Sequence, residues 1–253
     1  MQKKTLLTIF FSILFWSCGP KDIRPNQDFP TQEEIQKGKD LAKLVGKFTS
    51  ENPKDYIWKI RDTWSDSLYA KFVFKVGTPL AENPTELKVE FISQEEWTIH
   101  FEKPIANQLG FSKKNGKLFA IQKEGTKEID DSTAELYCES LVVYLSSLYE
   151  IPRMNRIAFV REDDADDYLF ASKNQFSANK ETDQYILGIS KKFQYPVGAQ
   201  FTYRKVFQSY VGYLQYTTDL VDDILVLKSI QVKDSEEESG FVHSLEILSK
   251  VKK

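Results

Sequence analysis

Cysteine and histidine are scarce in this chain of 253 residues, which contains only two of each. The two histidines, His100 and His243, lie far apart in the sequence. Neither has a second His or a Cys at the spacing of a metal-ligand pair. On alternation, His100 is placed on the wetter face of its strand, and His243 falls within the last strand. The sequence therefore predicts no metal site of the zinc type.

Motifs for catalysis and phosphate binding are also missing. We find no phosphate-binding glycine loop, no H-E-x-x-H and no C-x-x-C. The G-x-S-x-G elbow of hydrolases is broken at its last position in residues 188–192 (GISKK). The sequence predicts a protein that is not an enzyme and that holds no cofactor.

Positive and negative charges are nearly balanced, because the chain has 34 Lys and Arg and 37 Asp and Glu, for a net charge of −3. This leaves no basic excess for binding nucleic acid. The densest charge run, residues 162–167 (EDDADD), offers oxygens of the kind that calcium prefers. It lacks the glycine and the twelfth-position glutamate of an EF-hand loop, so a solvated hairpin loop is favoured over a metal site.

Long apolar runs are absent except at the N-terminus, where residues 6–16 follow Lys3 and Lys4. This run has the length of a secretory signal core and is shorter than the roughly 20 residues that span a bilayer. Ser17 precedes Cys18 in a pattern that resembles the signal peptide of bacterial lipoproteins, with Phe15 where Leu is usual. The resemblance implies cleavage before Cys18 and lipidation of its thiol. An uncleaved anchor and a plain secreted protein are the alternatives.

Lipidation of Cys18 would leave Cys138 without a disulfide partner. Cys138 lies on the apolar side of a predicted helix, so we expect a buried and unreactive thiol. On this interpretation residues 1–17 are the signal peptide. Residues 18–30 are the lipidated cysteine with a flexible, proline-spaced tether, and residues 31–253 form a single domain.

Two helices are predicted among many strands. Thr31 with Glu34, and Ser132 with Glu135, have the spacing of capping boxes that begin helices ending near residues 48 and 149. Residues 113–116 (KKNG) predict a hairpin turn. Period-2 alternation predicts strands elsewhere, over residues 56–61, 68–76, 86–93, 96–102, 118–122, 157–161, 168–172, 184–190, 197–206, 209–218, 224–233 and 240–251. Sequential strands with two helices indicate an α+β fold.

Aromatic residues are abundant, with 18 Phe and 12 Tyr, and many of them alternate along the predicted strands. Such residues could line an apolar cavity. They could equally fill a packed core, because both structures need the same alternating face. The candidates for cavity lining are Phe72, Phe74, Phe91, Trp97, Phe101, Phe119, Phe201 and Tyr203.

The order of the predicted elements resembles the lipoprotein carrier fold of LolA/LolB-like proteins. Residues 107–119 (NQLGFSKKNGKLF) are similar to a strand, turn and aromatic strand of that family, with Asn115 where Asp is usual. Residues 185–197 (YILGISKKFQYPV) resemble a second hairpin, although residues 191–193 depart from the family's turn. The resemblance implies a mostly antiparallel meander sheet curved into a half-barrel, with two helices packed on its concave side. It also implies a pocket for an acyl chain.

These observations lead us to expect a monomeric, non-enzymatic lipoprotein of the bacterial cell envelope. Lipidated Cys18 would hold it to a membrane, with the outer membrane favoured over the inner one. Its partner would be a lipid or the acyl chain of a lipoprotein, bound in the half-barrel. The alternative is a structural or protein-interaction lipoprotein with a filled core and no ligand.

Overall fold

The computed structural model describes residues 22–26, 28–65, 83–105, 107–177, 183–203, 210–233 and 241–253. Cys18 and two predicted cavity residues, Phe72 and Phe74, lie outside these ranges. The strand predicted over residues 68–76 lies outside them as well.

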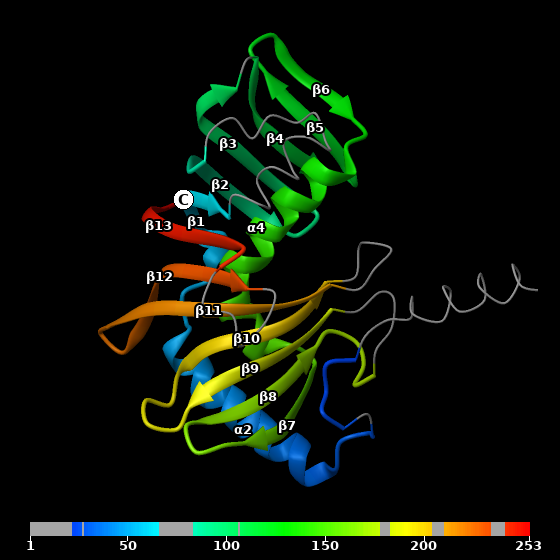
Figure 1. The fold of residues 1–253 in the computed structure, drawn as a ribbon, viewed down its shortest axis with the longest axis vertical. Coiled ribbons are helices and arrows are strands. Elements are labelled where there is room, and N and C mark those ends of the chain that lie inside the picture. The colour runs from blue at the N-terminus through cyan, green and yellow to red at the C-terminus, as the bar shows by residue number, and fades with distance from the viewer. Residues whose placement is uncertain are drawn as a thin grey trace, which may run out of the picture.

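The described strands form one antiparallel sheet (Figure 1). They are β1 (Tyr56–Trp64), β2 (Thr85–Ser93), β3 (Glu96–Ile105), β4 (Gln108–Lys114), β5 (Lys117–Gln122), β6 (Gly125–Ile129), β7 (Arg156–Glu162), β8 (Asp166–Ser172), β9 (Gln184–Ser190), β10 (Pro196–Tyr203), β11 (Tyr210–Val221), β12 (Ile224–Lys233) and β13 (His243–Lys252). The order of these 13 strands is β6-β5-β4-β3-β2-β1-β13-β12-β11-β10-β9-β8-β7.

Strands that are consecutive in sequence are neighbours in the described sheet, except for β6 and β7. β1 pairs with β13, so that Tyr56 lies opposite Lys252 and the first described strand meets the last. β6 and β7 remain as the two edges, and the described sheet is not closed into a barrel. This confirms the predicted α+β fold with an open, curved meander. β6 was not predicted, because Gly125–Ile129 exposes most of its side chains and shows no apolar alternation.

The two predicted helices are present as α2 (Gln32–Phe48) and α4 (Ser132–Glu150). The capping box of α2 is confirmed, since Thr31 Oγ1 accepts from the backbone N–H of Glu34 at 3.2 Å and Glu34 Oε2 accepts from that of Thr31 at 2.7 Å. The box predicted for α4 is wrong. Asp131 is its N-cap, because its carboxylate accepts from the backbone N–H groups of Thr133 and Ala134.

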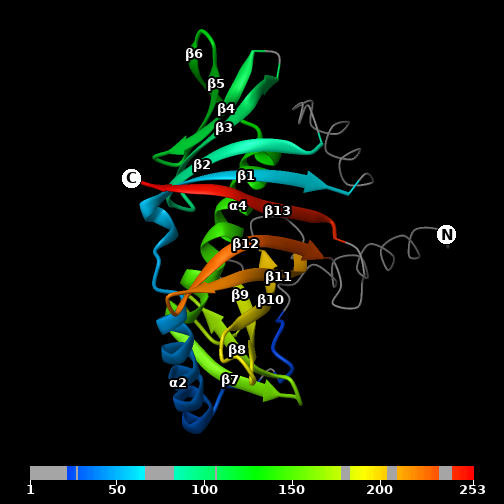
Figure 2. The ribbon, with the colours of Figure 1, turned by 90° about the vertical axis from the view of Figure 1, so that its left-hand side faces the viewer.

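Helix α4 supplies much of the core. It runs across the strands on the concave side of the sheet (Figures 1 and 2). Its side chains are buried on nearly every side, including Leu141, Val142 and Leu145. Cys138 is fully buried there as predicted, and burial raises the pKa of its thiol well above the usual range. Helix α2 packs chiefly against β7 and adds Ala42 and Val45 to the same core.

The short turns of β9–β10 (residues 191–195) and β11–β12 (residues 222–223) lie at one end of the sheet, together with the C-terminus. These lie on the left in Figure 1. We call this the hairpin end and the other the opposite end. The β4–β5 turn carries Asn115 and Gly116 with positive φ values of 53° and 72°, as its Asn-Gly sequence predicts.

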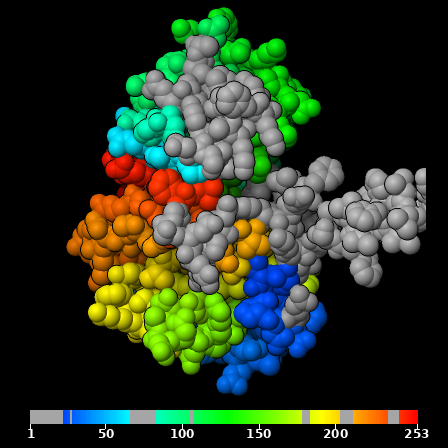
Figure 3. Space-filling view, viewed as in Figure 1, coloured from blue at the N-terminus to red at the C-terminus, as the bar shows by residue number. Residues whose placement is uncertain are grey.

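The chain before α2 differs from the predicted free tether. Its described residues between Asp22 and Pro30, here called the N-terminal clamp, lie on the outer face of the sheet beside β7 and β8 (dark blue in Figure 3). Ile23 and Arg24 are buried. The tether prediction missed this docking because residues 19–30 contain three prolines and no helical or strand-like period.

Candidate functional site

The concave interior holds four of the predicted cavity residues in one packed core, namely Phe91, Trp97, Phe101 and Phe201. Neighbouring rings fill the space around them. Phe101 meets Phe111 edge-on with ring centroids 5.9 Å apart, and Phe201 meets Tyr144 of α4 at the same separation. At these positions the packed-core alternative describes the structure.

The remaining predicted cavity residues do not add to this face. The prediction that Phe119 lines the concave interior is wrong. Strand β5 directs Leu118 and Ala120 into the core and leaves Phe119 half-buried on the outer face. Its register explains this, since Ala120 pairs with buried Phe111 and Phe119 pairs with Ser112. Only the backbone of Tyr203 is described, at the end of β10.

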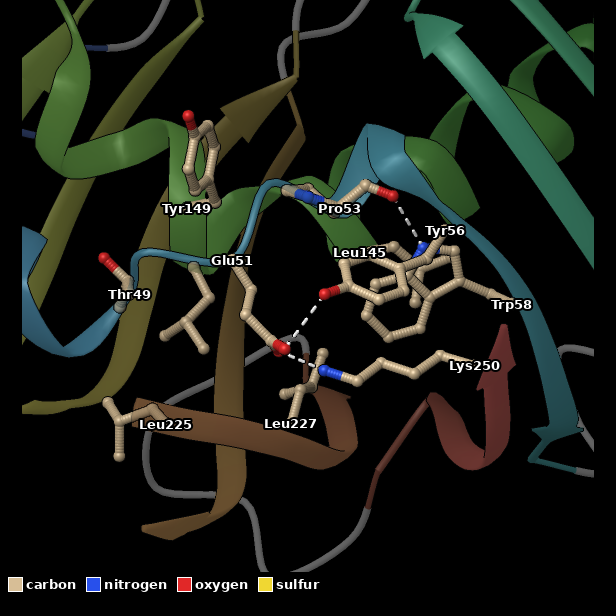
Figure 4. Close-up of a pocket in the computed structure, with 11 residues that line it drawn as sticks. Thr49, Glu51, Pro53, Tyr56, Trp58, Leu145, Tyr149, Leu225, Leu227 and Lys250 are labelled. Carbon is tan, nitrogen blue, oxygen red and sulfur yellow. Dashed lines mark hydrogen bonds and ion pairs between the residues drawn. The ribbon is translucent and has the colours of Figure 1, made fainter. Parts of the chain in front are cut away.

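A small hollow remains at the hairpin end, between α4, the first residues of β12 and the 3-10 helix η1 (Pro53–Asp55) (Figure 4). Its volume is about 30 Å³, enough for about two water molecules. Four leucines form its floor, two from α4 and two from β12. They are Leu145, Leu148, Leu225 and Leu227.

The rim of the hollow is polar. Glu51 accepts a hydrogen bond from the Tyr56 hydroxyl at 3.0 Å and forms an ion pair with Lys250 (Figure 4). Burial and the bond to Glu51 raise the pKa of Tyr56, so its hydroxyl stays a donor. Trp58 closes one side and donates from Nε1 to the carbonyl of Pro53 at 2.9 Å. An apolar floor under a charged rim suits a ligand with an apolar tail and a polar head.

A buried polar centre joins β1, β13 and α4 deeper in the core. Asp62 is fully buried and is bonded to His243 Nε2, the Tyr137 hydroxyl and Trp64 Nε1, the last at 2.9 Å. The Trp64 and His243 rings stack with centroids 4.2 Å apart. Burial and the charge of Asp62 raise the pKa of Tyr137 well above its usual range. We interpret this centre as a structural link between α4 and the sheet, because Tyr137 of α4 is bonded to Asp62 of β1, which is also bonded to His243 of β13.

A second buried ionic group fastens the N-terminal half of α4. Lys113 of β4 lies 2.5 Å from Glu139, 2.6 Å from Glu135 and 2.6 Å from Glu95. Lys113 was predicted in a turn, but it ends up buried because β4 continues through Lys114. Burial alone lowers the pKa of Lys113, and the bonds to the three carboxylates more than offset this and raise it.

The acidic run at residues 162–167 forms the β7–β8 hairpin loop, as its solvated-loop interpretation predicts. Asp163 accepts from the backbone N–H groups of Ala165 and Asp166 and from the Tyr168 hydroxyl. Within the described residues, no group of three or more His, Cys, Asp or Glu side chains is placed to hold a metal ion. Across the same residues, no helix has the length and apolarity needed to cross a membrane.

No protein-family model and no curated protein matches this sequence. Among solved structures, a LolA superfamily protein from Nitrosomonas europaea superposes with a TM-score of 0.50 and 13% identity, over 85% of this chain and 93% of that chain. This chain has a LolA-like fold.

Two further structures align with this chain at lower similarity. A DUF1329 family protein from Desulfovibrio piger has a TM-score of 0.49 and 11% identity, over 87% of this chain and 93% of that one. A domain assigned to outer membrane lipoprotein sorting, from Vibrio parahaemolyticus, has a TM-score of 0.47 and 10% identity over the same shares.

Proposed function

We propose that the protein is a membrane-anchored, non-enzymatic lipoprotein of the bacterial cell envelope, and that its half-barrel binds an apolar ligand such as an acyl chain. The observation that carries this proposal is the hollow with four leucines on its floor and the Glu51–Lys250 ion pair on its rim. The LolA-like fold supports it. The pattern around Cys18 supports attachment to a membrane, with the outer membrane favoured.

The hollow must widen to hold an acyl chain. At about 30 Å³ it lacks room for a chain of several methylenes. The segment that would move is the connection between α2 and β1, which covers the hollow. It is held by the Glu51–Lys250 pair and by Arg153, whose guanidinium donates to the carbonyl of Thr49 at 2.8 Å. Each buried methylene would then contribute about 0.8 kcal/mol.

Filling the hollow should weaken ligand binding. We expect Leu148→Phe, in the mature chain made soluble by Cys18→Ser, to bind a fluorescent fatty acid at least about tenfold more weakly, a loss of about 1.4 kcal/mol. Titration of the probe into the purified protein measures this. The matched control is Leu118→Phe, a buried leucine of β5 that is not among the residues lining the hollow.

The control separates ligand exclusion from general overpacking, which costs about 1–3 kcal/mol of stability at either site. Equal weakening in both variants would contradict binding at the hollow. Mass spectrometry of organic extracts of the protein purified without its signal, with the leucines of the hollow intact, adds an independent measurement. We expect a co-purified lipid there.

The anchor has its own test. The full-length Cys18→Ser variant should appear in the soluble fraction and take up no radiolabelled palmitate, because a thioether-linked diacylglyceryl group requires the Cys18 thiol. The unsubstituted protein should be labelled and sediment with membranes. A Cys18→Ser protein that still takes up label and sediments with membrane would overturn the anchor.

A second candidate function is a protein-interaction lipoprotein with a filled core. The packing of Phe91, Trp97, Phe101 and Phe201 favours it. Absence of any co-purified lipid, together with absence of fatty-acid binding, would decide for this candidate.

A further inference from the structure

The N-terminal clamp is attached to one particular place on the sheet. Ile23, which is 9% exposed, packs on the outer face against Phe170 of β8 and Ile186 of β9. Its backbone N–H points to Gln184 Oε1 at 3.4 Å. Gln184 is the first residue of β9 and pairs with Ser172, the last residue of β8. The clamp therefore meets the sheet at the opposite end, away from the hairpin turns.

A buried ion pair fixes the clamp. Arg24 donates to both carboxylate oxygens of Asp22, with distances of 2.9–3.3 Å, and both side chains are nearly inaccessible to solvent. The remaining guanidinium nitrogen donates to the carbonyl of Asp28 at 3.0 Å, which draws the clamp into a compact loop. The guanidinium also lies over the Phe170 ring, 5.5 Å from its centroid. A planar, fork-shaped cation suits this arrangement and a lysine does not.

Docking shortens the chain between Cys18 and the folded domain. From Cys18 to Asp22 there are four residue steps, which span at most about 14 Å when extended. If the clamp were free, the chain would run to Thr31, thirteen steps away, and would reach about 45 Å. The clamp thus removes roughly two thirds of the reach that a lipid-anchored domain would have.

The hollow lies at the other end of the molecule. Its rim is made by the beginning of β1 and the end of β13, and its floor by the beginning of β12, all at the hairpin end. The exposed Phe193 of the β9–β10 turn lies there too. Strand β9 alone has seven residues and separates the two ends by about 23 Å. Figure 1 shows the dark-blue clamp on the right and the hairpin turns on the left.

We propose that the N-terminal clamp orients the domain on the membrane surface, with the opposite end of the sheet toward the lipid and the hairpin end with its hollow facing away. An apolar ligand or a partner then reaches the hollow from the side of the aqueous compartment. This inference rests on lipid attachment at Cys18, as in the proposed function. It adds the direction from which the site is approached.

Two exposed residues of the folded domain allow a direct test. Asn174 is exposed and follows Ser172, the last residue of β8, at the opposite end, and Phe193 at the hairpin end is 50% exposed. Each is replaced, in separate mature chains, by an azide-bearing phenylalanine that carries a fluorophore. Cys18 is coupled to maleimide lipid in phosphatidylcholine vesicles. Cys138 does not compete because it is fully buried. Nitroxide-labelled headgroups in the same vesicles then quench any fluorophore that approaches them.

We expect the fluorophore at position 174 to be quenched at least about threefold more than the one at position 193, because nitroxide quenching is short-ranged compared with about 23 Å of strand. Arg24→Ala should bring this ratio close to one, because it removes the ion pair with Asp22. Ile23→Asp should do the same, because a carboxylate is costly to bury against Phe170 and Ile186. Arg156→Ala, at an exposed arginine of β7, should leave the ratio unchanged. Circular dichroism confirms that each variant is folded.

Equal quenching at the two positions in the unsubstituted clamp, or stronger quenching at position 193, would overturn the orientation. A ratio that survives both clamp variants would overturn the role of the clamp. Because the lipid is attached chemically, the result does not depend on lipidation in the cell. Failure of palmitate labelling is therefore a separate outcome that bears on the proposed anchor alone.

Discussion

Lys113→Met should lower the free energy of unfolding by about 3–5 kcal/mol, because removal of one partner leaves a buried charge uncompensated. Glu139 is 1% exposed and Lys113 is 4% exposed, so water cannot replace the lost ammonium group. Glu135 and Glu95 are more accessible, and their contributions are screened. Chemical denaturation followed by circular dichroism measures the change.

The matched control lies a few residues away. Lys117 forms an ion pair with Glu128 at 2.9 Å, and both side chains are more than half exposed. Lys117→Met should therefore change stability by less than about 1 kcal/mol. The double variant Lys113→Met with Glu139→Gln should recover part of the loss, since it also removes the buried charge of the Glu139 carboxylate. Similar effects of Lys113→Met and Lys117→Met would show that the buried group does not fasten α4 to β4.

Local signals in the sequence predicted most of the fold. The Thr31 capping box, the Asn115-Gly116 turn and the period-2 alternation each depend on residues within a few positions of one another, so a single sequence reveals them. The apolar phase was right for Phe91, Trp97, Phe101 and Phe201. It was wrong for Phe119, because an aromatic residue on the outer face leaves the same local pattern as one on the inner face.

The parts that could not be predicted depend on residues far apart in the sequence. The hollow brings Tyr56 and Lys250 to the same rim and closes it with leucines of α4 and β12. Asp62 meets His243 across 181 positions, and Ile23 meets Gln184 across 161. Each of these contacts follows from the pairing of β1 with β13, or from docking on the outer face. Neither leaves a periodic trace in the sequence.

These distant contacts also separate two roles for polar groups on the concave side. Charges at the rim of the hollow are partly exposed, as Lys250 and Glu51 show, and can exchange bonds when the covering segment moves. Asp62, Lys113 and Glu139, which hold α4, are by contrast buried in the core. A ligand could thus enter at the rim while α4 keeps its place, which makes the stability of α4 and the binding of a ligand separately measurable.

Asp62→Ala should lower the free energy of unfolding by about 3–5 kcal/mol, comparable to breaking a buried ion pair. The substitution removes the shared acceptor of the Tyr137 hydroxyl, Trp64 Nε1 and His243 Nε2 in the core, and loss of a hydrogen bond to a buried group costs about 1–3 kcal/mol. Asp219→Ala is the control. Asp219 pairs with Lys228 on the surface, and its loss should cost less than about 1 kcal/mol.

A double-mutant cycle with Tyr137→Phe tests whether the centre acts as one unit. Tyr137→Phe removes one donor but leaves Asp62 with Trp64 and His243, so it should be the milder change. In the Asp62→Ala background the hydroxyl has already lost its acceptor, and its removal should cost little or even restore stability. We therefore expect a coupling of at least about 1 kcal/mol between the two sites. Additive effects would mean that Asp62 does not hold Tyr137.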